Sequence, residues 1–328
     1  MSNDDEKLER LKNLISIAES YILEKSNKIN RMISFVRKRK DEYQNAFDLI
    51  NDNYKPKYKT SNKIDENILL ERFCIELQNY QAMPRAIDYS AYQRDDKNND
   101  LFEYVQKKYQ EFNKISDEYK LSLYESFIAE FNISEEKNII DANSEQKKIL
   151  SSKQDKSKFN VAWLRYSIGI AYVFDYIKNK DGLNKIKSLI DETKKEDFYD
   201  NIVDFNDKLK DNLVDYIYYL GKALSYDLLK ELCCDKLIKD DTHIIKLYQE
   251  FIDEKCTDGK VVKQFFNLYK RLIEDKKYNN YTLYYIDKLL WLCCTGEFYN
   301  DGFTINNFTR KKFIRYANKN GLSSLKSK

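Results

Sequence analysis

The residues best suited to chemistry lie between Ile217 and Leu247, in the stretch IYYLGKALSYDLLKELCCDKLIKDDTHIIKL. Two carboxylates, Asp240 and Asp241, precede His243, which is the one histidine of the chain. Carboxylate and imidazole side chains are common general acids and bases in enzymes. The stretch therefore contains candidate catalytic groups, although Asp241 also stands where a helix N-cap is expected.

Two helices joined by a short polar connection are predicted to position these groups. Gly221 indicates a tight turn before the first helix, because glycine tolerates a positive φ without steric cost. The first helix carries apolar residues at helical spacing: Leu224, Leu228, Leu229 and Leu232. Three charged residues are left for its outer face: Asp227, Lys230 and Glu231. After the connection at 234–240, Asp241 precedes a second helix with its own apolar residues: Ile244, Ile245, Leu247 and Tyr248.

This arrangement resembles the helix-hairpin-helix DNA glycosylases and their lyase relatives. Their pattern is Leu-Pro-Gly-(Val/Ile)-Gly-x-Lys, a helix, and then an Asp in a context such as Asp-Thr-His-Ile. Aligned without gaps, Gly221 matches the second glycine, and Ile217 and Leu220 match the apolar positions. The lysine position falls on Ala223, and the Asp motif falls on residues 241–244, eighteen residues later. The resemblance covers roughly residues 160–325.

The resemblance implies duplex DNA with a flipped base as the partner. Backbone N–H groups at Leu220, Gly221 and Lys222 would hold a phosphate, and Asp241 would lie beside the flipped nucleotide. The Asp241 carboxylate would stabilise positive charge on the sugar as the N-glycosidic bond breaks, or activate the attacking water. Asp240 is an alternative carboxylate, while His243 and Lys222 are accessory candidates. No cofactor or metal is implied.

The departures from the pattern narrow the expected chemistry. Tyr218 and Tyr219 replace the Pro and the first glycine, and Ala223 replaces the lysine that forms a Schiff base in bifunctional members. Lys222 stands one residue early, which turns it about 100° around a helix. A monofunctional glycosylase is the enzyme that this sequence permits. Two alternatives stay open, namely an inactive glycosylase-fold protein that binds DNA or another protein, with phage defence as one setting, and an unrelated all-α scaffold in which Asp241 only caps a helix.

Several aromatic side chains are candidates for stacking on a base. They lie in the helices that flank the motif: Trp163, Tyr166, Tyr285 and Trp291. Large aromatic residues at helical spacing are more often part of a protein core, so each also has a purely structural interpretation.

Composition predicts an all-α protein without a metal site. The 328 residues include only 2 Pro and 7 Gly, which disfavours a fold with many strands and turns. Net charge is +3 from 57 basic and 54 acidic residues, so any DNA-binding surface has to be local. Six cysteines without Cys-x-x-Cys spacing and a single histidine do not form a zinc motif. The polar N-terminus and the lack of a long apolar run predict a cytoplasmic protein with reduced thiols and no membrane contact.

Two helical domains are expected along the chain. Residues 1–132 would form an N-terminal bundle with a long first helix at about 4–52, whose heptad series suits self-association, a protein partner or packing on its own chain. This helix includes the basic cluster Arg37 to Lys40. Residues 133–158 are predicted to be a polar linker or a mobile loop, and residues 159–328 would form the glycosylase-like helical domain. In the apolar helix after Phe159, Gly169 is expected to allow close helix approach. Further helices are predicted near 64–79, 101–113, 116–131, 183–192, 203–215, 260–273, 282–293 and 308–318.

Overall fold

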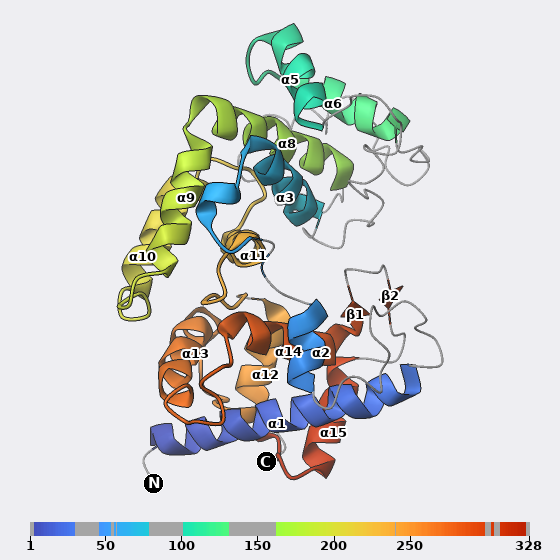
Figure 1. Cartoon of the computed structure of the whole chain (residues 1–328). Helices are drawn as coiled ribbons and strands as arrows, with labels where there is room; N and C mark the ends of the chain where they lie inside the picture. Colours follow the sequence, from blue (N-terminus) through green and yellow to red (C-terminus); the bar gives the residue numbers. More distant parts are fainter. Residues whose placement is uncertain are drawn as a thin grey trace. The chain divides into compact units, whose positions relative to one another are not determined.

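The structure is a computed structural model, which describes residues 3–29, 46–53, 56, 58–78, 101–130, 162–239, 241–298, 303–304 and 309–325. These residues form thirteen α-helices, a short 3-10 helix, a short π-helix and one pair of two-residue strands (Figure 1). The predicted all-α class is therefore confirmed. None of the described helices is long and apolar enough to span a membrane.

The helices follow the apolar spacing of the sequence closely. In chain order they are α1 (Asn3–Ile29), α2 (Ala46–Asn53), η2 (Ser61–Lys63), α3 (Glu66–Gln78), α5 (Leu101–Phe112), α6 (Asp117–Glu130), α8 (Ala162–Asn179), α9 (Gly182–Thr193), α10 (Ile202–Leu209), η5 (Lys210–Val214), α11 (Lys222–Leu232), α12 (Thr242–Phe251), α13 (Asp258–Leu272), α14 (Leu283–Thr295) and α15 (Arg310–Lys319). Every helix predicted after the first one is present. The predicted first helix at 4–52 contains α1 and α2, and its basic cluster lies outside the described residues.

Two compact units divide the chain, and each combines segments that are distant in sequence. Unit 1 comprises Met1–Lys57, Glu196–Ile202 and Cys234–Lys328, and unit 2 comprises Tyr58–Lys195 and Val203–Cys233. Helix α1 thus shares a unit with helices α12 to α15. A division of the chain at residues 133–158 would instead place them in different domains. The predicted linker itself lies outside the described residues.

Unit 1 is built around α14, an almost wholly apolar helix. Residues Leu283 to Cys294 are buried, and α1, α2, α12 and α15 pack against the helix (Figure 1). The heptad positions of α1 face this core, since Leu11, Ile15 and Ala18 are fully buried. The part of the heptad face within α1 is therefore covered by helices of its own chain. Strands β1 (Glu297–Phe298) and β2 (Phe303–Thr304) pair antiparallel beyond α14.

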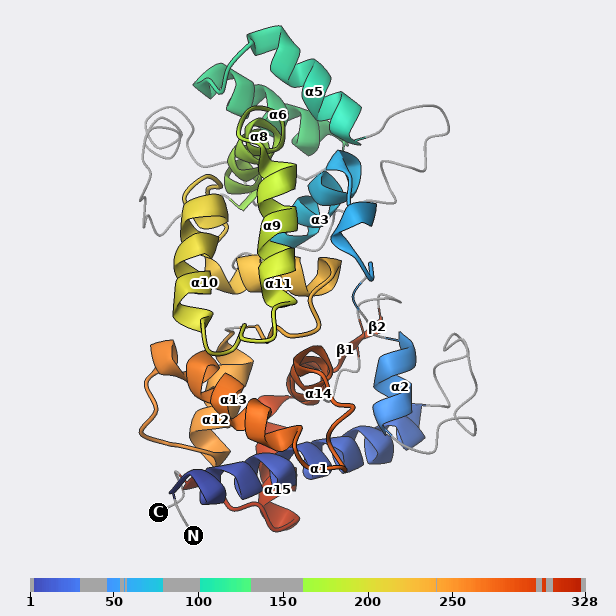
Figure 2. The ribbon, with the colours of Figure 1, turned by 60° about the vertical axis from the view of Figure 1, so that its left-hand side comes forward.

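Unit 2 is built around α8, which packs against α3, α5, α6 and α9 (Figure 2). Gly169 lies in the middle of α8. A Cβ atom at Gly169 would come within 2.9 Å of Leu77 Cδ1 on α3 and 3.4 Å of the Tyr218 carbonyl oxygen. The expectation that Gly169 permits close helix approach is confirmed, and the same absence of a side chain leaves room for the turn that precedes α11.

Candidate functional site

The turn before α11 places its left-handed residue at Tyr219. The φ angle of Tyr219 is 67°, whereas Gly221 has φ −76° and ψ 174°. The prediction that Gly221 supplies the positive φ is therefore wrong. The Leu220 amide donates to the Ile217 carbonyl at 3.4 Å and closes the turn before Gly221. A left-handed backbone costs a residue with a Cβ roughly 1–2 kcal/mol, so other contacts must hold Tyr219 in place.

Those contacts come from α8. The ring of Tyr219 packs against Leu164 and Ile168, and the Arg165 guanidinium lies 5.7 Å from its centroid. The bulk that distinguishes tyrosine from the glycine of the family pattern is thus accommodated on α8. At Gly221, by contrast, an added Cβ would meet no atom within 4 Å. The backbone at the start of α11 is open.

The three residues predicted to bind phosphate through their backbone lie at the start of α11, where Leu220 precedes the N-cap Gly221 and Lys222 is the first helical residue. Gly221 is the exposed N-cap and provides no side-chain cap, whereas the Leu220 side chain is buried. The Lys222 ammonium lies 5.6 Å from the ring centroid of Tyr226, farther along α11. A helix start that lacks a side-chain cap presents N–H donors and the positive end of the helix dipole, which together attract anions.

Asp241 is the N-cap of α12, as the sequence predicts. Its backbone is extended, with φ −110° and ψ 166°. Its Oδ1 atom accepts hydrogen bonds from the amides of His243 at 2.8 Å and Ile244 at 3.0 Å. Both bonds use the same carboxylate oxygen, and the side chain is only half-buried. The carboxylate is therefore held in one orientation while Oδ2 takes part in neither bond.

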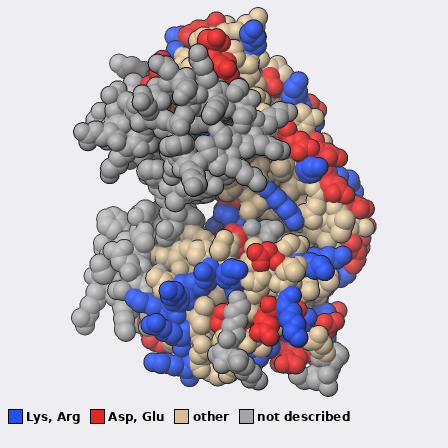
Figure 3. Space-filling view, turned by 180° about the vertical axis from the view of Figure 1, so that it is seen from behind, with Lys and Arg blue, Asp and Glu red and all other residues tan. Residues whose placement is uncertain are grey.

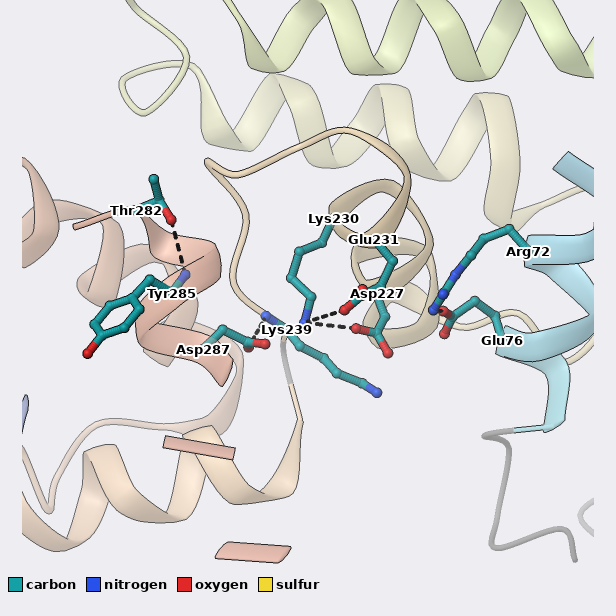
Figure 4. Close-up of polar contacts among 9 residues, drawn as sticks. All are labelled: Arg72, Glu76, Asp227, Lys230, Glu231, Lys239, Thr282, Tyr285 and Asp287. Carbon is teal, nitrogen blue, oxygen red and sulfur yellow. Dashed lines mark hydrogen bonds and ion pairs between the residues drawn. The ribbon is translucent and has the colours of Figure 1, made fainter. Parts of the chain in front are cut away.

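Helix α14 holds the connection that leads into Asp241. The amide of Lys239 donates to Asp287 Oδ1 at 2.8 Å (Figure 4), and the amide of Tyr284 donates to the Asp235 carbonyl at 3.0 Å. Asp287 is buried. Two hydrogen bonds to α14, one accepted and one donated by the helix, thus fix the chain shortly before the candidate catalytic carboxylate.

Residues from α14 and α15 surround the α12 cap. Arg310 Nη1 donates to the Thr242 carbonyl at 3.3 Å. Burial, and then the charge of Asp241, raises the pKa of the Cys294 thiol well above its usual value, while Arg310 acts in the opposite direction. Cys294 is therefore a neutral thiol near neutral pH and lacks the thiolate character of a nucleophile. Of the groups in this environment, Asp241 and Arg310 are the ones suited to polar chemistry.

The predicted site residues are divided between the two units. Leu220, Gly221 and Lys222 belong to unit 2, whereas Asp241 and His243 belong to unit 1. His243 is half-buried in the first turn of α12. Asp240 lies outside the described residues. Each half of the predicted motif is formed within its own unit.

The aromatic candidates for base stacking are core residues where their side chains are described. Tyr166, Tyr285 and Trp291 are at most 8% exposed. The Tyr285 hydroxyl also donates to Glu19 Oε1 at 2.8 Å. Trp163 lies in α8, and its side chain is outside the described residues. The structural interpretation therefore fits these three rings, because a ring buried in the core offers no surface to a base.

The outer face predicted for α11 is in fact buried, and it forms part of an ion network in unit 2 (Figure 4). Lys230 is 1% exposed and Asp227 is 7% exposed. The Lys230 ammonium lies 2.8 Å from Asp227 Oδ1 and 3.8 Å from Glu231 Oε1. On α3, which packs against α11, Arg72 forms an ion pair with Glu76. The assignment of Asp227 and Lys230 to an outer face is therefore wrong.

The two ion pairs belong to one electrostatic environment. Burial alone would lower the pKa of Arg72, but the carboxylates of Glu76, Glu231 and Asp227 raise it above its usual value. The sequence indicates these ion pairs only through the spacing of opposite charges, which lie three residues apart on α11 and four residues apart on α3. That signal shows which charges pair within a helix, but it does not show that a neighbouring helix covers them.

The described residues contain no group of three or more His, Cys, Asp or Glu side chains arranged to hold a metal ion. Comparisons of the chain with known protein families, curated proteins and solved structures find no match. Asp241 at the start of α12 and the open start of α11 are thus the features on which a function can be built.

Proposed function

We propose that the protein is a monofunctional DNA N-glycosylase that uses Asp241 to hydrolyse the N-glycosidic bond of a flipped, damaged or modified nucleotide. The observation that carries the proposal is the geometry of Asp241. This half-buried carboxylate is oriented by two backbone N–H donors on Oδ1, and neither bond engages Oδ2. The resemblance of residues 217–244 to glycosylases supports the same role.

The chemistry needs one well-placed carboxylate. Hydrolysis breaks the bond between the sugar and the base, adds the hydroxyl group of water to the sugar carbon and leaves the base with a proton. Positive charge develops on the sugar in the transition state, as in other glycoside hydrolyses. A carboxylate held in a fixed orientation stabilises that charge, or accepts the proton of the attacking water, without first having to reorganise.

The residues at the start of α11 favour hydrolysis over strand cleavage. Ala223, at the lysine position of the family pattern, has no amine that could form a Schiff base. The neighbouring Lys222 directs its ammonium towards Tyr226. The expected product is therefore an abasic site in an uncut strand. The open start of α11 would bind a backbone phosphate through its N–H groups.

A glycosylase assay tests the proposal. The purified chain is incubated with duplexes that each carry one damaged or modified base, and abasic sites are revealed by alkaline cleavage. We expect at least one duplex to yield abasic sites with the wild type. Without the alkaline step its strand should stay intact. Asp241→Asn should lose this activity, because asparagine caps a helix as well as aspartate but carries no negative charge.

A second candidate function follows from Tyr219. Where the family pattern has glycine, this chain has a tyrosine held in the left-handed region, so the turn is preserved while its surface differs. A DNA-binding protein that has lost the chemistry fits this observation. This second function would be favoured if the protein binds DNA but releases no base from any duplex, and if the wild type and Asp241→Asn bind with equal affinity.

A further inference from the structure

Helix α15 concentrates positive charge in a chain that is otherwise nearly balanced. Residues 302–328 contain seven Lys or Arg and no Asp or Glu. The net charge of the whole chain is only +3, so the remaining residues are net acidic. Five of the seven basic residues lie within α15: Arg310, Lys311, Lys312, Arg315 and Lys319. Figure 3 shows Lys and Arg side chains gathered at the lower left of the molecule, where α15 lies when the view of Figure 1 is turned.

The charges of α15 follow one face of the helix. Lys311, Arg315 and Lys319 recur every four residues and are exposed, so they form a continuous stripe. We refer to these three residues as the α15 stripe. Phe313 and Ala317 form the opposite face and are fully buried. Phe313 packs on the ring of Tyr21 in α1 at a centroid distance of 5.3 Å. The α15 stripe is therefore fixed on a helix whose apolar face is anchored in unit 1.

The α15 stripe has no ion-pair partner in the part of the chain that the structure describes. Among the described residues, no acidic side chain forms an ion pair with Lys311, Arg315 or Lys319. Some exposed lysines elsewhere do pair with a carboxylate, for example Lys194 with Asp191 at 2.9 Å. The first turn of α15 contains no acidic residue, although cations at a helix start oppose the helix dipole. Lys311 in the first turn opposes the dipole, whereas Lys319 in the last turn agrees with it. A row of like charges to which no described carboxylate is paired suits an anion outside the chain.

The α15 stripe begins at the cap that holds Asp241. Arg310, one residue before Lys311, donates to the Thr242 carbonyl at 3.3 Å. Arg310 and Asp241 also act on the same thiol, that of Cys294. A polyanion bound along the α15 stripe would therefore pass close to the candidate catalytic carboxylate.

We propose that the α15 stripe binds the phosphate backbone of DNA and brings the duplex to Asp241. The identification of the polyanion as DNA rests on the proposed function, whereas the presence of the basic surface does not depend on that function. A stripe of lysine and arginine without base-reading side chains suits contacts that position a duplex and are independent of sequence. An anionic membrane is the less suitable partner, because the apolar face of α15 is buried in its own unit and offers nothing to insert into lipid.

The test measures the salt dependence of DNA binding by the full chain. The variant replaces Lys311, Arg315 and Lys319 by Gln, and the probe is a fluorescent duplex of mixed sequence. The matched control replaces three other exposed lysines of unit 1, which lie among acidic residues: Lys255, Lys260 and Lys263. Circular dichroism melting curves establish that both variants fold.

Losing three phosphate contacts should reduce the slope of log K against log salt by about 3 and weaken binding at least about ten-fold at low salt. The control should keep the wild-type slope. A stripe variant with the wild-type slope and affinity would overturn the proposal, as would a wild type that fails to bind the duplex or that prefers anionic vesicles to it. Base release is scored separately with Asp241→Asn. If the stripe variant has the reduced salt slope and the wild type releases no base, the result supports DNA binding by the α15 stripe and rejects the glycosylase. If the wild type releases a base and the stripe variant keeps the wild-type slope, the result supports the glycosylase and rejects DNA binding by the α15 stripe.

Discussion

Tyr219 adopts a backbone conformation that costs a residue with a Cβ free energy, and its ring packs against α8. The glycosylase pattern that residues 217–223 resemble has glycine at this position, and glycine accepts a left-handed φ without steric cost. The left-handed φ is a property of the turn. The identity of the residue could not be explained from the sequence, because the α8 contacts that compensate the strain come from residues more than forty positions away in the chain.

Substitutions at Tyr219 should separate backbone strain from ring packing. Both Tyr219→Gly and Tyr219→Ala remove the ring, but only glycine accepts φ 67° without strain. We expect the Gly variant to be more stable than the Ala variant by about 1 kcal/mol in urea unfolding. The same pair of substitutions at Tyr216, which lacks a positive φ, should favour Ala or leave the two equal. An Ala variant at 219 as stable as the Gly variant would show that the turn is not strained.

Lys230 compensates two carboxylates in the interior of unit 2. Lys230→Met would remove the buried ammonium that pairs with Asp227 and Glu231, so we expect a loss of about 3–5 kcal/mol in the free energy of unfolding. The double variant Lys230→Met, Asp227→Leu should regain part of that loss, because it removes a buried charge together with its partner. As a control, Lys260→Met at an exposed site should change stability by less than about 0.5 kcal/mol. A single variant as stable as the wild type would contradict the burial of this network.

Helix positions were largely encoded by local apolar spacing. Leu224, Leu228 and Leu232 predicted α11, and the structure contains the helix at that place. The same spacing led to the wrong prediction that Lys230 lies on an outer face. Helical spacing shows which residues share a face but not whether a neighbouring helix covers that face. In α11 both the apolar and the charged faces are covered. The net charge of the whole chain did not reveal the α15 stripe, because acidic residues elsewhere in the chain offset its positive charge.

The cysteines of α3 and α14 should be inert in the folded protein. Burial raises the pKa of Cys74 to about 12 and that of Cys293 well above its usual value. A raised pKa reduces the thiolate fraction at pH 8, and burial also blocks access. We expect Cys74, Cys293 and Cys294 to resist a disulfide reagent at pH 8, as mapped by mass spectrometry, while all six cysteines react in denaturant. Labelling of native Cys293 at the denatured rate would mean that α14 is not a core helix.

The assembly of each unit is the part of the fold that the sequence did not reveal. The heptad face of α1, with Leu11, Ile15 and Ala18, predicted that something covers the helix, but an apolar face does not name its partner. The structure assigns that role to helices from the other end of the chain. For the same reason the sequence predicted the turn before α11 and the Asp241 cap, each a local feature, but not their assignment to different units.

The most direct test of the proposed function compares stability and base release for one variant, Asp241→Asn. Because asparagine preserves the cap, its free energy of unfolding should stay within about 0.5 kcal/mol of the wild type. Base release should nevertheless fall by about 100-fold or more, as expected when a catalytic group is removed. Thr282→Ala, which removes the side-chain cap of α14, should show the opposite pattern, with a loss of about 1 kcal/mol and active folded protein. Base release by Asp241→Asn at the wild-type rate would contradict a catalytic role for Asp241.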